Sequence, residues 1–255
     1  MNHSFRIFFT LVCALYYSAC MAQVSNTDNS WKFFIEPYVM FPNMNGETGI
    51  RNLPAVEVDA SAGDIFSKLQ FGAMLYMEAQ NDKWAITSDL LYMDLEQDVA
   101  PTALINSGAA SAKQLGYELA GLYRLAPFLE TGLGLRLNNI NSELEIVRNT
   151  VGGGTESLSA SLSRTWIDPI LIARATADVN NKWLFTFRGD FGGFGIGSDF
   201  TWQAQGYVGY RFSKLFQTSV GYRIIGIDYD KGSSEDRFRY DMNTFGPNIR
   251  LGFNL

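Results

Sequence analysis

The sequence predicts an all-β protein, an up-and-down antiparallel β-barrel of about ten strands that spans a membrane, with eight strands as the alternative. Apolar residues alternate with polar residues or glycine at a period of two along most of the chain, which is typical of strands with one apolar face. Each alternating segment has at least roughly the 9–11 residues that a tilted strand needs to cross a bilayer. Short turns and long polar connections also alternate, so the two ends of the expected barrel differ.

The first 22 residues differ from the rest of the chain and are similar to a secretory signal peptide. MNHSFR is short and positively charged, and the apolar run IFFTLVCALYYSA is followed by Ala22, a small residue after which cleavage is expected. The barrel domain then covers residues 23–255. The alternative is a lipoprotein cut before Cys20 in Tyr17-Ser18-Ala19-Cys20, although a lipid anchor is redundant for a chain embedded in a membrane.

Ten alternating segments make up the expected barrel. Leucine occupies positions 129, 133, 135 and 137, and Glu130, Gly132, Gly134 and Arg136 lie between them, so one face is apolar and the other is polar or glycine. The expected strands lie near residues 31–41, 71–80, 84–95, 113–124, 128–139, 165–179, 183–192, 200–212, 215–228 and 237–255.

The connections between these segments alternate in length. The tight turns are Asn81-Asp82-Lys83, Leu125-Ala126-Pro127, Asn180-Asn181-Lys182 and Ser213-Lys214. The longer polar segments are 42–70, 96–112, 140–164, 193–199 and 229–236. Bacterial outer-membrane barrels have this asymmetry, with the short turns in the periplasm, and an even number of strands places both chain ends on that side.

Aromatic residues are expected to form girdles at the two membrane interfaces, where amphipathic rings prefer to lie. The group beside the short turns is Trp84, Tyr123, Phe128, Trp183, Phe212 and Phe216, and the group toward the long connections is Tyr92, Trp166, Trp202 and Tyr222. The alternative is that these rings are the core of a soluble sheet protein.

The last expected strand changes phase. Its odd-numbered positions are apolar from Ile249 to Leu255, but its even-numbered positions are apolar from Phe238 to Met242. We therefore expect a register shift across Asn243-Thr244-Phe245-Gly246-Pro247, with a bulge at which Pro247 is tolerated. The alternative is that residues 229–244 form a loop and the last strand is short.

Five glycines lie between Gly189 and Gly197, a density that suggests either a phosphate loop or a tight turn. A dinucleotide loop needs the spacing GxGxxG and a following helix, whereas the segment after these glycines alternates like a strand, and no P-loop lysine follows. The glycines therefore predict a hairpin tip, where positive φ angles and close strand approach are needed.

Two other parts of the long connections stand out. AGDIFSKLQ (62–70) places Ile65, Phe66 and Leu69 on one helical face after Asp64 as a cap, which predicts a short helix at the barrel mouth; the alternative is an irregular lead-in to the second strand. Segments 103–113 and 149–163 are rich in Ser, Gly and Ala and are expected to be mobile external loops.

Charged residues recur in the polar phase of the strands, so they face the lumen if the apolar phase faces lipid. Opposite charges in a narrow lumen should pair, which gives either a filled barrel core, the favoured interpretation, or a charge-lined conduit for small solutes. The members of this expected network are Glu36, Glu78, Asp89, Glu118, Glu130, Arg136, Asp168, Arg174, Arg188, Asp190, Arg211, Arg223 and Arg250.

Composition argues against most chemistry. Cys13, Cys20 and His3 all lie in the leader, so the mature chain has no thiol or imidazole for catalysis, disulfides or metal binding. Removing the leader also removes Arg6, which leaves 19 basic and 26 acidic residues, a net charge of −7 and no basic stripe for nucleic acid.

Acid–base chemistry is open only to paired carboxylates. Asp89 with Glu118, and Glu118 with Glu130, are expected on successive strands, but nearby arginines should hold these groups ionised. We therefore expect no enzyme activity, no catalytic residues, no cofactor and no metal.

Several stretches are similar to a widespread family of Gram-negative outer-membrane barrel proteins, of the porin-like or OmpA type. They are WKFFIEPYVMFPNMNG, VDASAGDIFSKLQFGAMLYMEAQNDKWAITSDLLYMDL, TWIDPILIARATADVNNKWLFT and GDFGGFGIGSDFTWQAQGYVGYRF with VGYRIIGIDYD after it. The resemblance implies a location in the outer membrane and no assigned activity. Its expected partners are outer-membrane lipid, lipopolysaccharide and the barrel-assembly machinery, with a monomer favoured. The C-terminal Leu255 departs from the usual Phe.

Three functional hypotheses follow. The first is an integral outer-membrane barrel that is structural or a narrow pore for small solutes. The second is a surface ligand-binding or adhesion barrel that acts through segments 42–70 and 140–164. The third is a soluble carrier, which would need an apolar interior and a polar exterior.

Overall fold

In the computed structural model of the chain, residues Trp31–Leu255 form a compact unit built from antiparallel strands. The structure describes residues 30–50, 55–99, 101, 105–150, 154–233 and 236–255. The leader expected at residues 1–22 and its cut sites lie outside the described residues. In the described part of the chain, no helix has the length and apolar character to cross a membrane.

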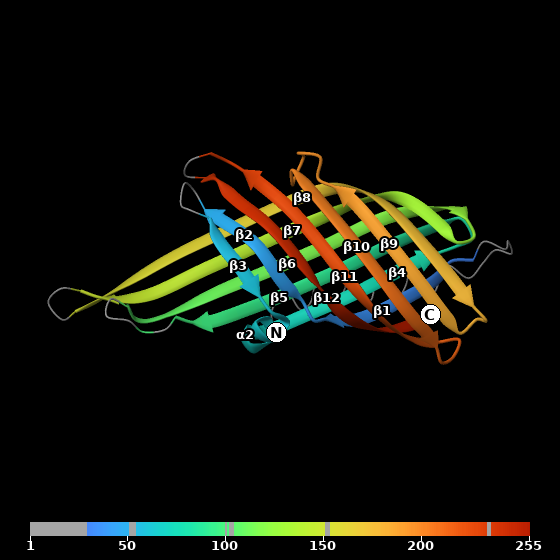
Figure 1. Cartoon of the computed structure of the whole chain (residues 1–255), viewed down its shortest axis with the longest axis horizontal. Helices are drawn as coiled ribbons and strands as arrows, with labels where there is room; N and C mark the ends of the chain where they lie inside the picture. The colour runs from blue at the N-terminus through green and yellow to red at the C-terminus, as the bar shows by residue number, and fades with distance from the viewer. Residues whose placement is uncertain (1–29, 51–54, 100, 102–104, 151–153, 234–235) are drawn as a thin grey trace, which may run out of the picture. The chain divides into compact units, whose positions relative to one another are not determined.

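Ten strands follow one another around a closed barrel, so the predicted fold class and the number of ten strands are confirmed (Figure 1). The closing pair is the first strand with the last. The barrel strands are β1 (Lys32–Met40), β4 (Leu69–Gln80), β5 (Trp84–Asp98), β6 (Ile105–Ala126), β7 (Leu129–Asn149), β8 (Thr155–Val179), β9 (Trp183–Gly192), β10 (Phe200–Arg211), β11 (Phe216–Lys231) and β12 (Phe238–Asn254).

The segment expected as the first long loop is largely ordered. β2 (Asn43–Ile50) continues β1 beyond Pro42, and β12 pairs with β1 through its second half and with β2 through its first half. β3 (Val56–Ala60) pairs with β2 only, at the end of the strand order. Residues 43–50 and 56–60 are therefore strands and not a loop, because β12 is long enough to offer ladder partners to both β1 and β2, and β2 in turn pairs with β3.

The predicted helix is present as α2 (Ala62–Lys68). Its N-cap is Ser61 and not Asp64: the Ser61 hydroxyl accepts from the Asp64 backbone N–H, and the Asp64 carboxylate accepts from the Ser61 N–H. This reciprocal capping box satisfies two N–H groups that the first turn leaves free. Ile65 of α2 is buried, whereas Phe66 is exposed and lies 5.3 Å from the Phe41 ring.

Four tight turns join β4 to β5, β6 to β7, β8 to β9 and β10 to β11, as predicted, at what we call the short-turn end of the barrel. At the opposite end, β7 and β8 extend far beyond β9, and β6 runs beside β7 along this extension (Figure 1). Residues 105–113 and 155–163, expected in loops, are therefore strand residues. Small polar residues are compatible with this because the three adjacent strands satisfy one another's backbone groups.

The outer surface of the barrel is apolar. Leu133, Leu135 and Val220 are 66%, 55% and 54% exposed, whereas Arg136 and Arg223 are each only 4% exposed. Membrane barrels have this arrangement, with apolar side chains against lipid and polar ones in the lumen. The arrangement excludes the soluble carrier.

Most of the rings expected near the short turns lie on this outer surface. Trp84 and Tyr123 are exposed and contact each other, and the exposed Trp183 contacts Tyr210. Trp166, expected in the opposite girdle, is buried in the lumen, because its even-numbered position on β8 faces inward.

β12 runs through residues 243–247 without the register shift expected there. Its even-numbered residues are buried from Phe238 to Gly252, and its pairing with β11 is continuous. The shift was predicted because the apolar phase was assumed to face lipid everywhere. Phe238, Tyr240 and Met242 instead point into an apolar part of the lumen.

The glycine-rich run is a hairpin tip, as predicted. Residues 193–199 join β9 to β10, and positive φ angles occur at Gly193 (+86°), Phe194 (+50°) and Gly195 (+76°). Glycine adopts such angles without the steric cost that other residues pay.

Candidate functional site in the lumen

The structure places twelve of the thirteen charged residues expected in the lumen at buried positions, with exposures of 9% or less. Arg211 is the exception: its side chain is 30% exposed near the short-turn end, where it pairs with Asp178. These side chains share the inward phase of the strands, so the barrel gathers them into one interior.

A layer of paired charges crosses the middle of the lumen, and we call it the charge layer. On one side, Arg136 Nη2 lies 2.8 Å from Glu118 Oε2 and 2.6 Å from Asp190 Oδ1. Arg188 also donates to Glu118 and lies 3.4 Å from Asp190. β6, β7 and β9 thus contribute two arginines and two carboxylates whose charges balance.

On the other side of the layer, Arg223 Nη1 lies 3.0 Å from Asp89 Oδ2 and donates to the Tyr38 hydroxyl over 2.9 Å. Tyr38 in turn donates to Asp89 over 2.7 Å. Gln203 joins the two sides, because it accepts from Arg223 Nε (2.8 Å) and donates to Asp190 (2.8 Å). The charge layer therefore joins side chains from seven of the ten barrel strands: β1, β5, β6, β7, β9, β10 and β11.

A second charged cluster lies closer to the short-turn end. Arg174 binds Glu78 through both terminal nitrogens (2.6 and 2.8 Å), and its Nε donates to Glu130 over 2.6 Å. Arg124 reaches Glu130 as well, over 2.8 Å. Two-pronged pairs of this kind are among the strongest hydrogen-bonded contacts in proteins.

Asp168 was expected to pair with an arginine, but its contacts in the described residues are to neutral donors. Its carboxylate accepts from the Ser198 backbone (2.6 Å) and hydroxyl (2.9 Å), from Asn138 (3.1 Å) and from Trp166 Nε1 (3.1 Å). Since Ser198 lies in the β9–β10 hairpin tip, Asp168 anchors that tip to the barrel wall.

The carboxylates considered for acid–base chemistry are each held by arginine. Asp89 and Glu118 are direct neighbours on β5 and β6, as predicted. Glu118 lies directly opposite Arg136 of the neighbouring strand β7, and Glu130 is held by Arg124 and Arg174. Among the described residues, no group of three or more His, Cys, Asp or Glu side chains is arranged to hold a metal ion.

Beyond the charge layer, the lumen becomes apolar. One cluster contains Trp166, which stacks on Tyr229 with ring centroids 4.3 Å apart, and extends to Phe238, Tyr240 and Met242. A second cluster is Met40, Ile65, Leu91 and Met93, into which α2 inserts Ile65; the rings of Tyr38 and Tyr76 join it, although their hydroxyls bind the charged groups beside it. We call these two sets the apolar clusters.

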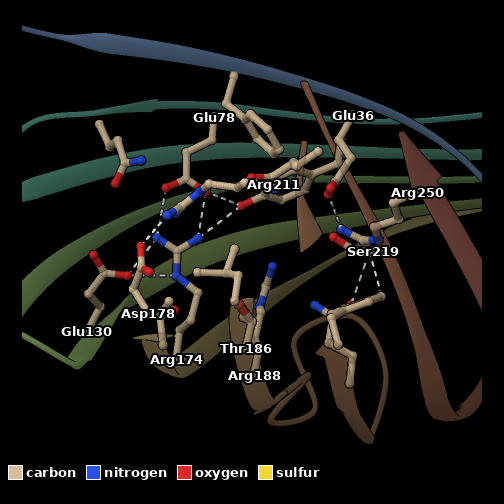
Figure 2. Close-up of a pocket in the computed structure, with 18 of the residues that line it drawn as sticks. Glu36, Glu78, Glu130, Arg174, Asp178, Thr186, Arg188, Arg211, Ser219 and Arg250 are labelled. Atoms are coloured by element: carbon tan, nitrogen blue, oxygen red, sulfur yellow. Dashed lines mark hydrogen bonds and ion pairs between the residues drawn. The ribbon is translucent and has the colours of Figure 1, made fainter. Parts of the chain in front are cut away.

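A cavity of about 290 Å³ lies in the lumen on the short-turn side of the charge layer (Figure 2). Figure 2 shows Arg174 beside Glu78 and Glu130, and Arg188 and Arg250 also line the cavity. Pro127 and Phe128 of the β6–β7 turn also line it, so we call it the short-turn cavity. A space of only about 40 Å³ lies on the other side of the layer.

Sequence reasoning missed the neutral members of this network. Tyr38, Gln203 and Tyr207 have the same inward phase as the charges and hydrogen-bond to them. Their positions in the strand pattern were the available indication, but an uncharged side chain at such a position does not reveal that it bridges two charges.

The fold and this lumen define the chain as a membrane-spanning β-barrel of the outer-membrane type. No family model matches the chain, and no curated protein matches it. Its solved structural neighbours are themselves outer-membrane barrels, among them channels, transporters and an attachment protein.

Three of these neighbours indicate how distant the likeness is. The TodX deltaS2S3 mutant monoaromatic hydrocarbon channel is 8% identical, with a TM-score of 0.40 over 90% of this chain and 91% of that chain. A Pseudomonas aeruginosa FadL homologue is 6% identical, with a TM-score of 0.37 over 89% of this chain and 90% of that chain. The Yersinia pestis attachment protein Ail is 8% identical, with a TM-score of 0.35 over 88% of this chain and 99% of that chain. We draw no functional argument from this likeness.

Proposed function

We propose that the protein is an integral outer-membrane β-barrel with a structural role, whose lumen is closed in the state described and carries no steady flow of solute. The observation that supports this is the charge layer, in which Arg136, Arg223 and their partners come from seven of the ten barrel strands and meet inside the lumen. The apolar clusters fill the lumen a second time beyond it.

Location and partners belong to the same proposal. The apolar outer surface would lie in lipid, with the short-turn end in the periplasm and the lipopolysaccharide leaflet toward the other end. Export would follow cleavage after Ala22, and folding would use the barrel-assembly machinery. We propose that the protein is a monomer. We also propose that it has no catalytic activity, because the carboxylates of the lumen serve as partners of arginine and of neutral donors.

Conductance across planar bilayers tests the closed lumen. The wild-type barrel is expected to show no steady open-channel current. The double variant Glu118→Ala with Arg136→Ala removes one negative and one positive side chain from the charge layer, so it opens space without leaving an unbalanced charge. We expect this variant to conduct.

The matched control replaces two neighbouring outward residues, Leu119→Ala with Leu135→Ala, which are exposed on the same strands. This control should stay as silent as the wild type, and heat-modifiable gel migration should show that all three proteins are folded. A steady wild-type current as large as that of the Glu118/Arg136 variant would contradict the proposal.

A second candidate is a surface recognition or adhesion barrel, and the length of β6, β7 and β8 favours it. They have 22, 21 and 25 residues, against 10 in β9. Twenty-five residues span about 80 Å when extended, far more than a bilayer needs. Cells that express a chain with these strands shortened should lose adherence to a host-cell layer if this candidate is right, and keep it otherwise.

A further inference from the structure

The arginines of the short-turn cavity differ in how many of their donors are already used. Arg174 contacts Glu130 through Nε, the Tyr76 hydroxyl (3.0 Å) and Glu78 through Nη1, and Glu78 again through Nη2. All three of its nitrogens are therefore occupied. Arg174 is a structural partner of the wall.

Arg188 has donors to spare. It is 3% exposed, lines the cavity, and contacts Glu118 and Asp190 through Nη2 alone. Its Nε is buried without an acceptor among the described residues, and its Nη1 makes no hydrogen bond to any of them. A buried guanidinium stabilises itself by using its five N–H donors, so unused donors beside a cavity favour an acceptor from outside the chain.

Arg250 is the second such group. It is 4% exposed, its Nη1 lies 3.2 Å from Glu36, and its Nη2 donates to the Tyr207 hydroxyl over 2.6 Å. Its Nε is buried and has no acceptor in the described part of the chain. The guanidinium carbon lies 4.1 Å from the Tyr207 ring centre and 5.3 Å from that of Tyr76, so aromatic faces hold the group in place.

Charge and size indicate what would bind. The described wall of the cavity carries five arginines and four carboxylates: Arg124, Arg174, Arg188, Arg211, Arg250, Glu36, Glu78, Glu130 and Asp178. Each of these carboxylates is already paired with an arginine, and Arg188 is paired with Glu118 and Asp190 behind the wall, so the cavity offers unused N–H donors and no unpaired carboxylate of this set. The volume of about 290 Å³ suits a small solute.

We propose that the short-turn cavity is a binding site for a small solute bearing a carboxylate or phosphate group, held by Arg188 and Arg250. Both groups are oxyanions that accept the charge-assisted hydrogen bonds a guanidinium donates. The site would open toward the periplasm and would not require a conducting lumen.

Isothermal titration calorimetry of the detergent-folded chain tests the site. The probes are sodium phosphate and sodium butyrate, with tetramethylammonium chloride at equal ionic strength as the cationic comparison. We expect saturable binding of at least one oxyanion and none of tetramethylammonium. Binding of phosphate only, of butyrate only or of both would show whether the site recognises a phosphate group, a carboxylate group or either.

Arg188→Lys and Arg250→Lys keep the positive charge and its ion pair but remove Nε and the planar fork. Each should weaken oxyanion binding about tenfold or more. Arg223→Lys is the matched control, because Arg223 is an equally buried lumen arginine that does not line this cavity. It should leave binding unchanged, and gel migration should show that each variant is folded.

Ser219→Leu tests the cavity without altering any charged residue. Ser219 lines the cavity, and a larger side chain there would occupy its space. It should also abolish binding. Absence of oxyanion binding, binding of tetramethylammonium instead, or an equal loss in Arg223→Lys would each overturn the proposal. None of these results depends on conductance, so the site and the closed lumen fail separately.

Discussion

At the scale of single residues, the lumen shows why its charges were predictable and their neutral partners were not. Arg136 occupies a position that alternates with leucines facing outward, so its inward direction follows from the strand pattern. A buried arginine must meet carboxylates, because an unpaired buried charge is costly. Which carboxylates it meets, Glu118 and Asp190, depends on strand register and barrel closure, which the sequence does not show.

Trp166 illustrates the opposite case. Tryptophan near a strand end is typical of an interface girdle, so an outward position was expected. Its indole Nε1 instead donates to Asp168 and to the Ser198 hydroxyl (2.8 Å). Ser198 is 32 positions away in the chain. A contact of this kind depends on the hairpin tip reaching the barrel wall, which strand periodicity cannot reveal.

A glycine of β12 that packs against the junction of β1 and β2 gives a residue-scale prediction. A Cβ atom on Gly246 would lie 1.9 Å from the Phe41 carbonyl oxygen, so Gly246→Ala must displace β12 or the β1–β2 junction. We expect lower thermal stability of the folded barrel in detergent, measured by the temperature at which heat-modified migration is lost.

Gly121→Ala is the control for this variant, because a Cβ there would meet nothing within 4 Å. It should unfold at the wild-type temperature. Equal behaviour of the two alanine variants would show that the backbone contact at Gly246 is not tight.

At the scale of elements, strand positions were predictable because each barrel strand has one outward apolar face and ends at a turn. The long extension of β6 was not, since its residues 105–112 are mostly Ser, Ala and Gly and carry no period-two contrast. The continuous register of β12 was also missed. The rule that apolar residues face lipid fails where the lumen itself is apolar, as it is around Tyr240.

α2 gives an element-scale prediction that depends on pH. Hydrogen bonds from Ser61 hold the pKa of the Asp64 carboxyl below its usual value of 3.8. Because the folded pKa is the lower one, the stabilisation is present above the unfolded pKa and is lost as pH falls through the folded pKa. Amide hydrogen exchange over residues 62–68, corrected for intrinsic rates, should therefore accelerate as the pH falls below about 4.

Ser61→Ala should have the same effect at neutral pH, with exchange in α2 about fivefold faster, because it removes the N-cap acceptor. Ser67→Ala is a comparison on the same helix: the Ser67 hydroxyl donates to a backbone carbonyl and not to Asp64's carboxylate. If Ser61→Ala and Ser67→Ala exchange alike, the capping box does not stabilise α2.

At the scale of the whole molecule, fold class was the most predictable property. Outward Leu, Val and aromatic residues, turns of alternating length and inward charges all describe the same barrel, and agreement across levels is what specifies a fold. The division of the lumen was beyond prediction. The short-turn cavity, the charge layer and the apolar clusters succeed one another along the barrel only because inward residues of distant strands meet at the same depth.

The direction of the side chains is the claim on which the membrane assignment depends, and two adjacent residues of β11 test it. Val220 is 54% exposed on the outer surface, and Ser219 is 5% exposed and lines the short-turn cavity. Nitroxide spin labels at Val220→Cys and Ser219→Cys, in the barrel reconstituted in lipid, report contact with dissolved oxygen, which concentrates in acyl chains, and with a water-soluble nickel complex. The label at Val220 should be relaxed by oxygen and protected from nickel, and the label at Ser219 should show the lower oxygen contact of the two. A Ser219 label in lipid with a Val220 label in water would contradict the account.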